Sequence, residues 1–211
     1  ELIVIREQGY RNVWITDGNF TFNLVRAKRL LSKMKQNGLT EGMRFFISSW
    51  ANIDREFLDL ASNCNIHIIS FGIESGCQEI LNFYQKNIQI AHISDLIQYA
   101  NSKGIFTVGN FILGAPIESN DSIEQTFALI RECEFDQINI KILDYMIGST
   151  LYSSLPESLK KHDHVFASAE NGLTVFSVEQ LTSRRDAFVK DYYAKHRERL
   201  AEKIRRFGTP Y

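Results

Sequence analysis

The sequence has few cysteines, no long apolar run and no surplus of either charge. Its three cysteines, Cys64, Cys77 and Cys133, are odd in number, far apart and form no CxxC pair. A disulfide framework is therefore not expected, and a reducing cytoplasmic location is predicted. No apolar stretch approaches the roughly 20 residues that a membrane-spanning helix needs. With 24 Lys and Arg residues against 25 Asp and Glu residues, the charge predicts neither a nucleic-acid partner nor a membrane partner.

What the chain does contain is a regular alternation of short apolar, β-branched runs with helical patterns. The predicted strands span residues 12–16, 44–48, 67–71, 106–113 and 137–142. Five strand–helix units in strict alternation predict an α/β fold whose parallel strands are joined by right-handed crossovers. From the pattern alone, both a doubly wound open sheet and a (β/α) barrel remain open.

The alternation stops after Ile147, and this defines the predicted domain organisation. Residues 1–150 form the strand–helix domain. Residues 151–177 are predicted to be an irregular connection, and residues 178–211 a C-terminal helical extension. In the connection, His162 and His164 stand two apart with no third ligand evident, so an exposed turn is predicted there rather than a metal site.

Polar or glycine-containing segments follow the predicted strands, at the ends where parallel α/β folds carry their chemistry. Asp17 follows the first strand, Glu74 the third, and Asn110 and Gly114 lie in and after the fourth. A carboxylate at Glu74 suits a ligand's ammonium or hydroxyl group, Asn110 suits a sugar hydroxyl, and Gly114 lets an aromatic base lie against the backbone.

Each of these residues also has a purely structural interpretation. Glu74 could cap the next helix, Asp17 could form an Asx turn, and Gly114 could belong to an ordinary Gly/Pro turn. Lys86, a few residues beyond Glu74, could pair with a carboxylate or could be an exposed lysine.

Taken together, these segments resemble the radical S-adenosylmethionine (SAM) superfamily, in the branch that shares the cobalamin-dependent and elongator-like core. Each motif is weak alone, but their order and spacing are specific. The segments are Asp17-Gly18-Asn19-Phe20-Thr21, Gly72-Ile73-Glu74-Ser75, Leu81 with Lys86, Gly104-Ile105, Phe111-Ile112-Leu113-Gly114-Ala115-Pro116-Ile117-Glu118, and Gly148-Ser149-Thr150-Leu151-Tyr152.

The resemblance implies a partial (β/α)6 TIM-like barrel with parallel strands, a missing first strand and a C-terminal helix. It implies that SAM lies across the strand ends, where Glu74 and Lys86 contact its methionyl or ribose polar groups. Asn110 would contact the ribose hydroxyls, Ile112 to Gly114 would back the adenine, and Asp17 would face SAM or the substrate.

The family's CxxxCxxC loop, which gives three thiolates to a [4Fe–4S] cluster, would lie before residue 1, and the three cysteines here cannot replace it. The expected function is therefore that of a barrel fragment: the full-length enzyme would cleave SAM reductively at the cluster, and this chain alone would be inactive. The resemblance also implies a cobalamin-binding domain upstream.

Two alternatives stay open. One is a barrel that has lost its cluster and serves as a non-catalytic binding module. The other is an ordinary (β/α) enzyme that uses Asp17 and Glu74 for acid–base chemistry without SAM. The sequence names no catalytic residue, no substrate beyond a small molecule and no oligomeric state, because substrate contacts come from loops and flanking domains that vary freely on one fold.

Overall fold

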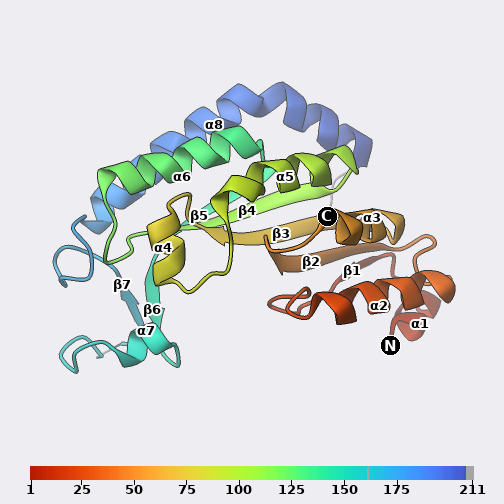
Figure 1. Cartoon of the computed structure of the whole chain (residues 1–211), viewed down its shortest axis with the longest axis horizontal. Helices are drawn as coiled ribbons and strands as arrows, with labels where there is room; N and C mark the ends of the chain where they lie inside the picture. Colours follow the sequence, from red (N-terminus) through yellow and green to blue (C-terminus); the bar gives the residue numbers. More distant parts are fainter. Residues whose placement is uncertain (161, 208–211) are drawn as a thin grey trace. The chain divides into compact units, whose positions relative to one another are not determined.

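The computed structural model describes residues 1–160 and 162–207, and its centre is a five-stranded sheet of order β1-β2-β3-β4-β5 (Figure 1). The strands are β1 (Asn12–Trp14), β2 (Arg44–Trp50), β3 (Ile66–Glu74), β4 (Phe106–Leu113) and β5 (Gln137–Ile142). Neighbouring strands from β1 to β4 pair in parallel, which confirms the predicted α/β fold. The strand order follows the chain without a reversal, as in a barrel, whereas a doubly wound sheet reverses its order at a switch point.

Helices connect the strands and flank the sheet. They are α1 (Leu2–Glu7), α2 (Leu24–Gln36), α3 (Arg55–Asn63), α4 (Gln78–Phe83), the 3-10 helix η1 (Ile90–His92), α5 (Ile93–Ser102), α6 (Asn120–Cys133), α7 (Thr150–Ser153) and α8 (Val178–Phe207). A second, antiparallel pair consists of β6 (Asp144–Met146) and β7 (His164–Phe166). In the described part of the chain, no helix has the length and apolarity that crossing a bilayer requires.

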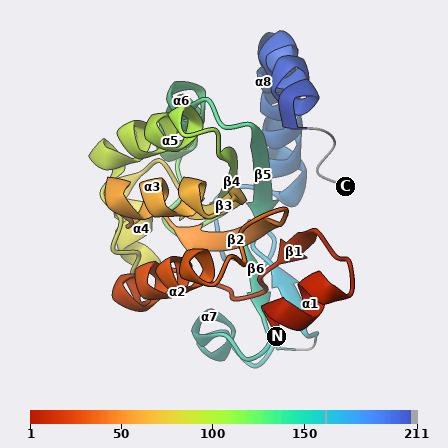
Figure 2. The ribbon, with the colours of Figure 1, turned by 90° about the vertical axis from the view of Figure 1, so that its right-hand side faces the viewer.

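The two faces of the sheet differ because side chains alternate along each strand. On one face the side chains are buried, as at Ile47 on β2 and Phe71 on β3. That face is covered by α2, α3 and α5, which line up on one side of the strands (Figure 2). The opposite positions of β2 and β3 are only half-buried and include small polar residues such as Ser48 and Ser70. The half-buried face is therefore the one that can accept a ligand.

The strand β1 forms one edge of the sheet. It has three residues, and its Trp14 side chain is 63% exposed, although the indole stacks on Phe46 with ring centroids 5.1 Å apart. The adjoining helix α1 contains the run Leu-Ile-Val-Ile and buries none of its residues. An edge strand next to exposed apolar side chains is an open pairing surface.

By its contacts the chain divides into two compact units, one of residues 1–111 with 128–139 and one of residues 112–127 with 140–211. Within the second unit, the ring of Phe127 on α6 stacks on Phe188 of α8 at 4.0 Å, so α8 is docked by aromatic packing.

The predicted domain limits at residues 150 and 177 stay a prediction. The connection between them contains α7 and β7. Its residue 161 lies outside the described residues, as do residues 208–211 of the predicted helical extension.

Candidate functional site

Glu74, Lys86 and Trp50 meet at the carboxyl ends of β2 and β3. Lys86 Nζ donates a hydrogen bond to Glu74 Oε1 at 2.8 Å and lies 4.3 Å from the centroid of the Trp50 ring. The side chains of Lys86 and Glu74 are only 15% and 14% exposed. Lys86 is therefore the paired cation that one interpretation of the sequence predicts, and an aromatic face adds to its binding.

The backbone around Glu74 is shaped to aim its carboxylate. The β3–β4 register shifts between Gly72 and Glu74, and Glu74 has a φ of +73°, a conformation that side-chain-bearing residues seldom adopt. A Cβ atom on Gly72 would stand 2.9 Å from Glu74 Oε1, so glycine leaves the space that the carboxylate occupies. Glu74 does not cap the following helix, because α4 has Cys77 at its N-cap and no side-chain cap.

Asn110 lies at the same level of the sheet as this cluster, since Trp50 pairs with Gly72 and Gly72 pairs with Asn110 in the strand register. Asn110 Nδ2 donates to Ser70 Oγ at 2.8 Å and to the Phe71 carbonyl at 3.1 Å.

Asn139 Nδ2 on β5 donates to Asn110 Oδ1 at 3.0 Å, which leaves that oxygen one further lone pair for a ligand donor. Sequence reasoning missed Asn139, because one amide inside an alternating strand carries no distinctive signal.

The loop after β1 places Asp17 differently. Its carboxylate is 50% exposed and lies 3.9 Å from Arg26 Nη1, so it is not drawn into the Glu74 cluster by any described contact. The anchored residue of this loop is Asn19, whose Oδ1 accepts from Thr21 Oγ1 at 3.0 Å and from the Trp50 backbone N at 3.3 Å. Asn19 Nδ2 is buried and has no hydrogen-bond partner among the described residues, so it can donate a hydrogen bond to a ligand oxygen.

Ile112 and Gly114 close β4 in the second unit. Ile112 is half-buried, whereas Gly114 is buried with a φ of +96°. Gly114 N donates to Glu118 Oε2 at 3.0 Å, and a Cβ on Gly114 would come within 3.1 Å of Leu181 Cδ1. Burial raises the pKa of the Glu118 carboxyl, although hydrogen bonds from Ser122 and from backbone N–H groups oppose that shift. The turn from Gly114 to Glu118 is thus held by packing and hydrogen bonds within the protein. The contact of Ile112 and Gly114 with the adenine of SAM stays a prediction.

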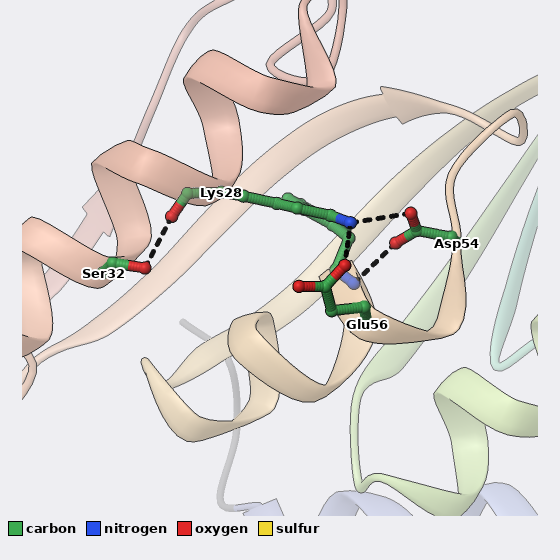
Figure 3. Close-up of polar contacts among 5 residues, drawn as sticks. Lys28, Ser32, Asp54 and Glu56 are labelled. Carbon is green, nitrogen blue, oxygen red and sulfur yellow. Dashed lines mark hydrogen bonds and ion pairs between the residues drawn. The ribbon is translucent and has the colours of Figure 1, made fainter.

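Lys28 braces the helices behind the sheet (Figure 3). Its Nζ donates to Asp54 Oδ2 at 2.7 Å and to Glu56 Oε2 at 2.5 Å, which links α2 to the first turn of α3. Asp54 is the N-cap of α3, and its Oδ1 accepts a hydrogen bond from Phe57 N at 2.8 Å. The hydrogen bonds to Asp54 and Glu56 raise the pKa of Lys28. Burial acts to raise the pKa of Asp54, but the bonds from Lys28 and Phe57 outweigh it and the pKa lies below its usual value.

The cysteines do not fit an iron–sulfur cluster. Cys64, Cys77 and Cys133 are all buried and free. Burial raises the pKa of the Cys64 thiol, and it raises that of Cys133 to about 12, so these thiols stay protonated rather than acting as thiolate ligands. Across residues 1–160 and 162–207, His, Cys, Asp and Glu form no group of three or more that could hold a metal ion.

Comparison with protein families gives a clear match. A profile described as the radical SAM superfamily matches residues 1–130. An uncharacterized methyltransferase from Pyrococcus horikoshii is 29% identical over 147 residues, which are 69% of this chain and 32% of that protein. The cytidylyl-2-hydroxyethylphosphonate methyltransferase of Streptomyces wedmorensis is 28% identical over 159 residues, 72% of this chain and 30% of that protein. The chain thus spans about a third of the length of these curated relatives.

Solved structures share the fold. Coproporphyrinogen III oxidase from Escherichia coli, described as a radical SAM enzyme, matches with a TM-score of 0.65 at 16% identity over 90% of this chain and 44% of its own. A radical SAM methyltransferase from Kitasatospora setae, solved with cobalamin and a [4Fe–4S] cluster, matches with a TM-score of 0.63 at 17% identity over 68% of this chain and 30% of its own.

Proposed function

The chain belongs to the radical SAM superfamily, and from that premise we propose that it is the later part of the barrel of a cytoplasmic enzyme. In its full length this enzyme would cleave SAM reductively at a [4Fe–4S] cluster and start radical chemistry on a small-molecule substrate. The observation that carries the proposal is the Glu74–Lys86–Trp50 cluster beside Asn110 at the strand ends.

The residues of this cluster suit the polar groups of SAM. The methionyl part of SAM carries an ammonium and a carboxylate, and Glu74 and Lys86 offer the two complementary charges 2.8 Å apart. The free lone pair of Asn110 Oδ1 accepts a ribose hydroxyl, Ile112 and Gly114 back the adenine, and Asp17 faces SAM or the substrate. SAM bound at a reduced cluster supplies a 5′-deoxyadenosyl radical, while the chain's own residues bind SAM, orient it and exclude water.

The cluster ligands belong to a part of the protein outside this chain, because the three cysteines here are buried and apart. This chain alone is therefore inactive. The exposed Trp14 and the open edge of β1 support a preceding strand that pairs there and carries the cluster loop. The likeness to a cobalamin-bound methyltransferase supports a cobalamin-binding domain upstream. Free thiols fit a reducing cytoplasm.

The test compares the 211-residue chain with the longer reading frame that contains it. Both are reconstituted anaerobically with ferrous iron and sulfide, and then given reductant and SAM. The longer protein should gain the broad visible absorbance of a [4Fe–4S] cluster and release 5′-deoxyadenosine and methionine, whereas the chain alone should do neither. A reading frame without an upstream CxxxCxxC segment would refute the proposal and favour the non-catalytic module.

Variants then test the site itself. Glu74→Gln and Lys86→Met in the longer protein should weaken SAM binding by about tenfold or more, the worth of one charged hydrogen bond, with the iron content unchanged. Lys103 provides a matched control, since its Nζ pairs with Asp59 Oδ1 at 2.6 Å and lies 4.8 Å from the Tyr99 centroid, away from the strand ends. Lys103→Met should leave SAM affinity unchanged.

A further inference from the structure

A histidine–aspartate pair on the β6–β7 hairpin has no part in the function proposed above. His164 Nδ1 lies 2.5 Å from Asp144 Oδ2. In the antiparallel register, Asp144 pairs with Phe166 and Met146 pairs with His164, so Asp144 and His164 are diagonal neighbours on one face of the hairpin. The sequence predicts an exposed turn around His164. In the structure His162 and Asp163 are exposed and form a bend, whereas His164, also exposed, begins β7 and has an acidic partner from a strand 20 residues earlier.

The pairing fixes which imidazole nitrogen is available. A carboxylate only accepts hydrogen bonds, so the contact with Asp144 places the proton on His164 Nδ1. In the neutral ring Nε2 then carries a lone pair and is an acceptor. The His164 side chain is 55% exposed, whereas that of Asp144 is 19% exposed. Asp144 Oδ1 is buried with no hydrogen-bond partner among the described residues, so the carboxylate is held through its other oxygen, Oδ2, by the contact with His164 Nδ1.

The neighbours of the pair are apolar and exposed. Met146 and Phe166 lie on the same face of the hairpin as Asp144 and His164, and they are 51% and 53% exposed. On the other face, Tyr145 and Val165 are buried. A hydrogen-bond acceptor between two exposed apolar side chains suits a ligand with an apolar skeleton that bears an O–H or N–H group.

The hairpin is tied to the strand end that bears Ile112 and Gly114, within the same compact unit. Leu143 N donates to the Leu113 carbonyl at 2.8 Å, and the Leu143 carbonyl accepts from Ala167 N at 2.8 Å. A Cβ on Gly114 would stand 3.5 Å from Ala167 Cβ. The Asp144–His164 pair therefore belongs to the edge of the sheet where (β/α) enzymes meet their substrates.

We propose that the Asp144–His164 pair, flanked by Met146 and Phe166, is a substrate-recognition site: His164 Nε2 accepts a hydrogen bond from an O–H or N–H group on a molecule with an apolar skeleton. That this molecule is the substrate rests on the radical SAM function proposed above. The binding itself does not, because neither SAM nor a cluster takes part in it.

The test uses phenol and anisole as probes, because anisole carries O–CH3 where phenol carries O–H and so cannot donate a hydrogen bond. The 211-residue chain is labelled at its histidines, and the imidazole signals of His164, assigned with His164→Gln, are followed by NMR during titration. Phenol should shift these signals saturably. Anisole should bind about fivefold more weakly, the ratio that one neutral hydrogen bond is worth.

Two variants distinguish ligand recognition by His164 from a purely structural role of the Asp144–His164 pair in the hairpin. Asp144→Asn keeps the shape, but its amide can donate to Nδ1 and so moves the proton to Nε2, and the preference for phenol over anisole should disappear. Phe166→Ala should weaken both probes alike and keep their ratio. His92→Gln, at an exposed histidine of the other unit, is the control and should leave both titrations unchanged.

The proposal is overturned if His164 does not respond to phenol, if both probes bind equally, or if Asp144→Asn keeps the wild-type preference. Any of these results would make the pair a brace for the hairpin and nothing more. They would leave the SAM-cleavage assay untouched, so the two proposals fail separately.

Discussion

Replacing Gly114 by alanine should destabilise the protein through two effects, backbone strain and steric overlap with a neighbouring side chain. At a φ of +96° a Cβ atom is disfavoured by about 1–2 kcal/mol through backbone strain alone. The same Cβ would also stand 3.1 Å from Leu181 Cδ1, which is tighter than ordinary contact and adds about 1–2 kcal/mol of overpacking. We therefore expect Gly114→Ala to lower the free energy of unfolding by about 3 kcal/mol, or about 9 °C in the thermal midpoint of a chain of this size.

Gly148 offers the matched control. Its φ is +87°, but a Cβ there would meet no heavy atom within 4 Å. Gly148→Ala should therefore carry the backbone strain alone, about 1.5 kcal/mol or about 4 °C. Thermal unfolding followed by circular dichroism measures both variants. In a Leu181→Ala background the extra cost of Gly114→Ala should vanish, because its steric partner is gone. Equal midpoints for the two glycine variants would refute the packing argument.

Three further predictions concern ionisable groups and their partners. Trp50→Leu in the longer protein should weaken SAM binding about fivefold and Trp50→Phe about twofold, because the aromatic face that holds Lys86 is lost or reduced; equal affinities in a SAM titration would show that Glu74 alone positions the lysine. Lys28→Met should lower the free energy of unfolding by about 0.5 kcal/mol, and this difference from wild type should stay constant from above pH 3.8 to below pH 10.5. The difference should shrink as pH falls through the lowered pKa of Asp54 or rises through the raised pKa of Lys28. Thermal midpoints of wild type and Lys28→Met are measured across this pH range. If the ion pair contributes nothing, the difference between the two midpoints will not change with pH. Because burial raises the pKa of Glu118 above 4.5, the folded state holds its proton longer than the unfolded state, so wild type should lose stability relative to Glu118→Gln as pH rises through that region; parallel pH–stability curves would contradict this.

The sequence predicts the parallel fold because β1 to β4 are each a short apolar run with a helical pattern after it, and the apolar run that forms β5 follows the last of these helices. It singles out Glu74 and Lys86, which lie 12 positions apart in one motif, but it leaves open whether Lys86 pairs with a carboxylate or is an exposed lysine; the structure shows the pair. It cannot predict Trp50 as the third member of the cluster, because that contact depends on the β2–β3 register. The role of Asn139 depends in the same way on a neighbouring strand.

The β6–β7 hairpin cannot be predicted from the sequence for another reason. The strands β6 and β7 have three residues each, too few to display an alternating pattern. Their pairing spans a polar connection, so nothing local to His164 indicates Asp144 as its partner. Asp17 illustrates the opposite case: its type and position stand out in the sequence, yet the fold anchors the loop through Asn19 instead.

The open edge at β1 has an optical consequence. The chain contains two tryptophans, and they report on different places, since Trp14 stands at the edge strand while Trp50 lies under Lys86. The water-exposed indole should emit at longer wavelength and be quenched readily by acrylamide, whereas the half-buried Trp50 should be quenched less. Loss of the quenchable fraction would then signal that another strand has joined the sheet, with no label added.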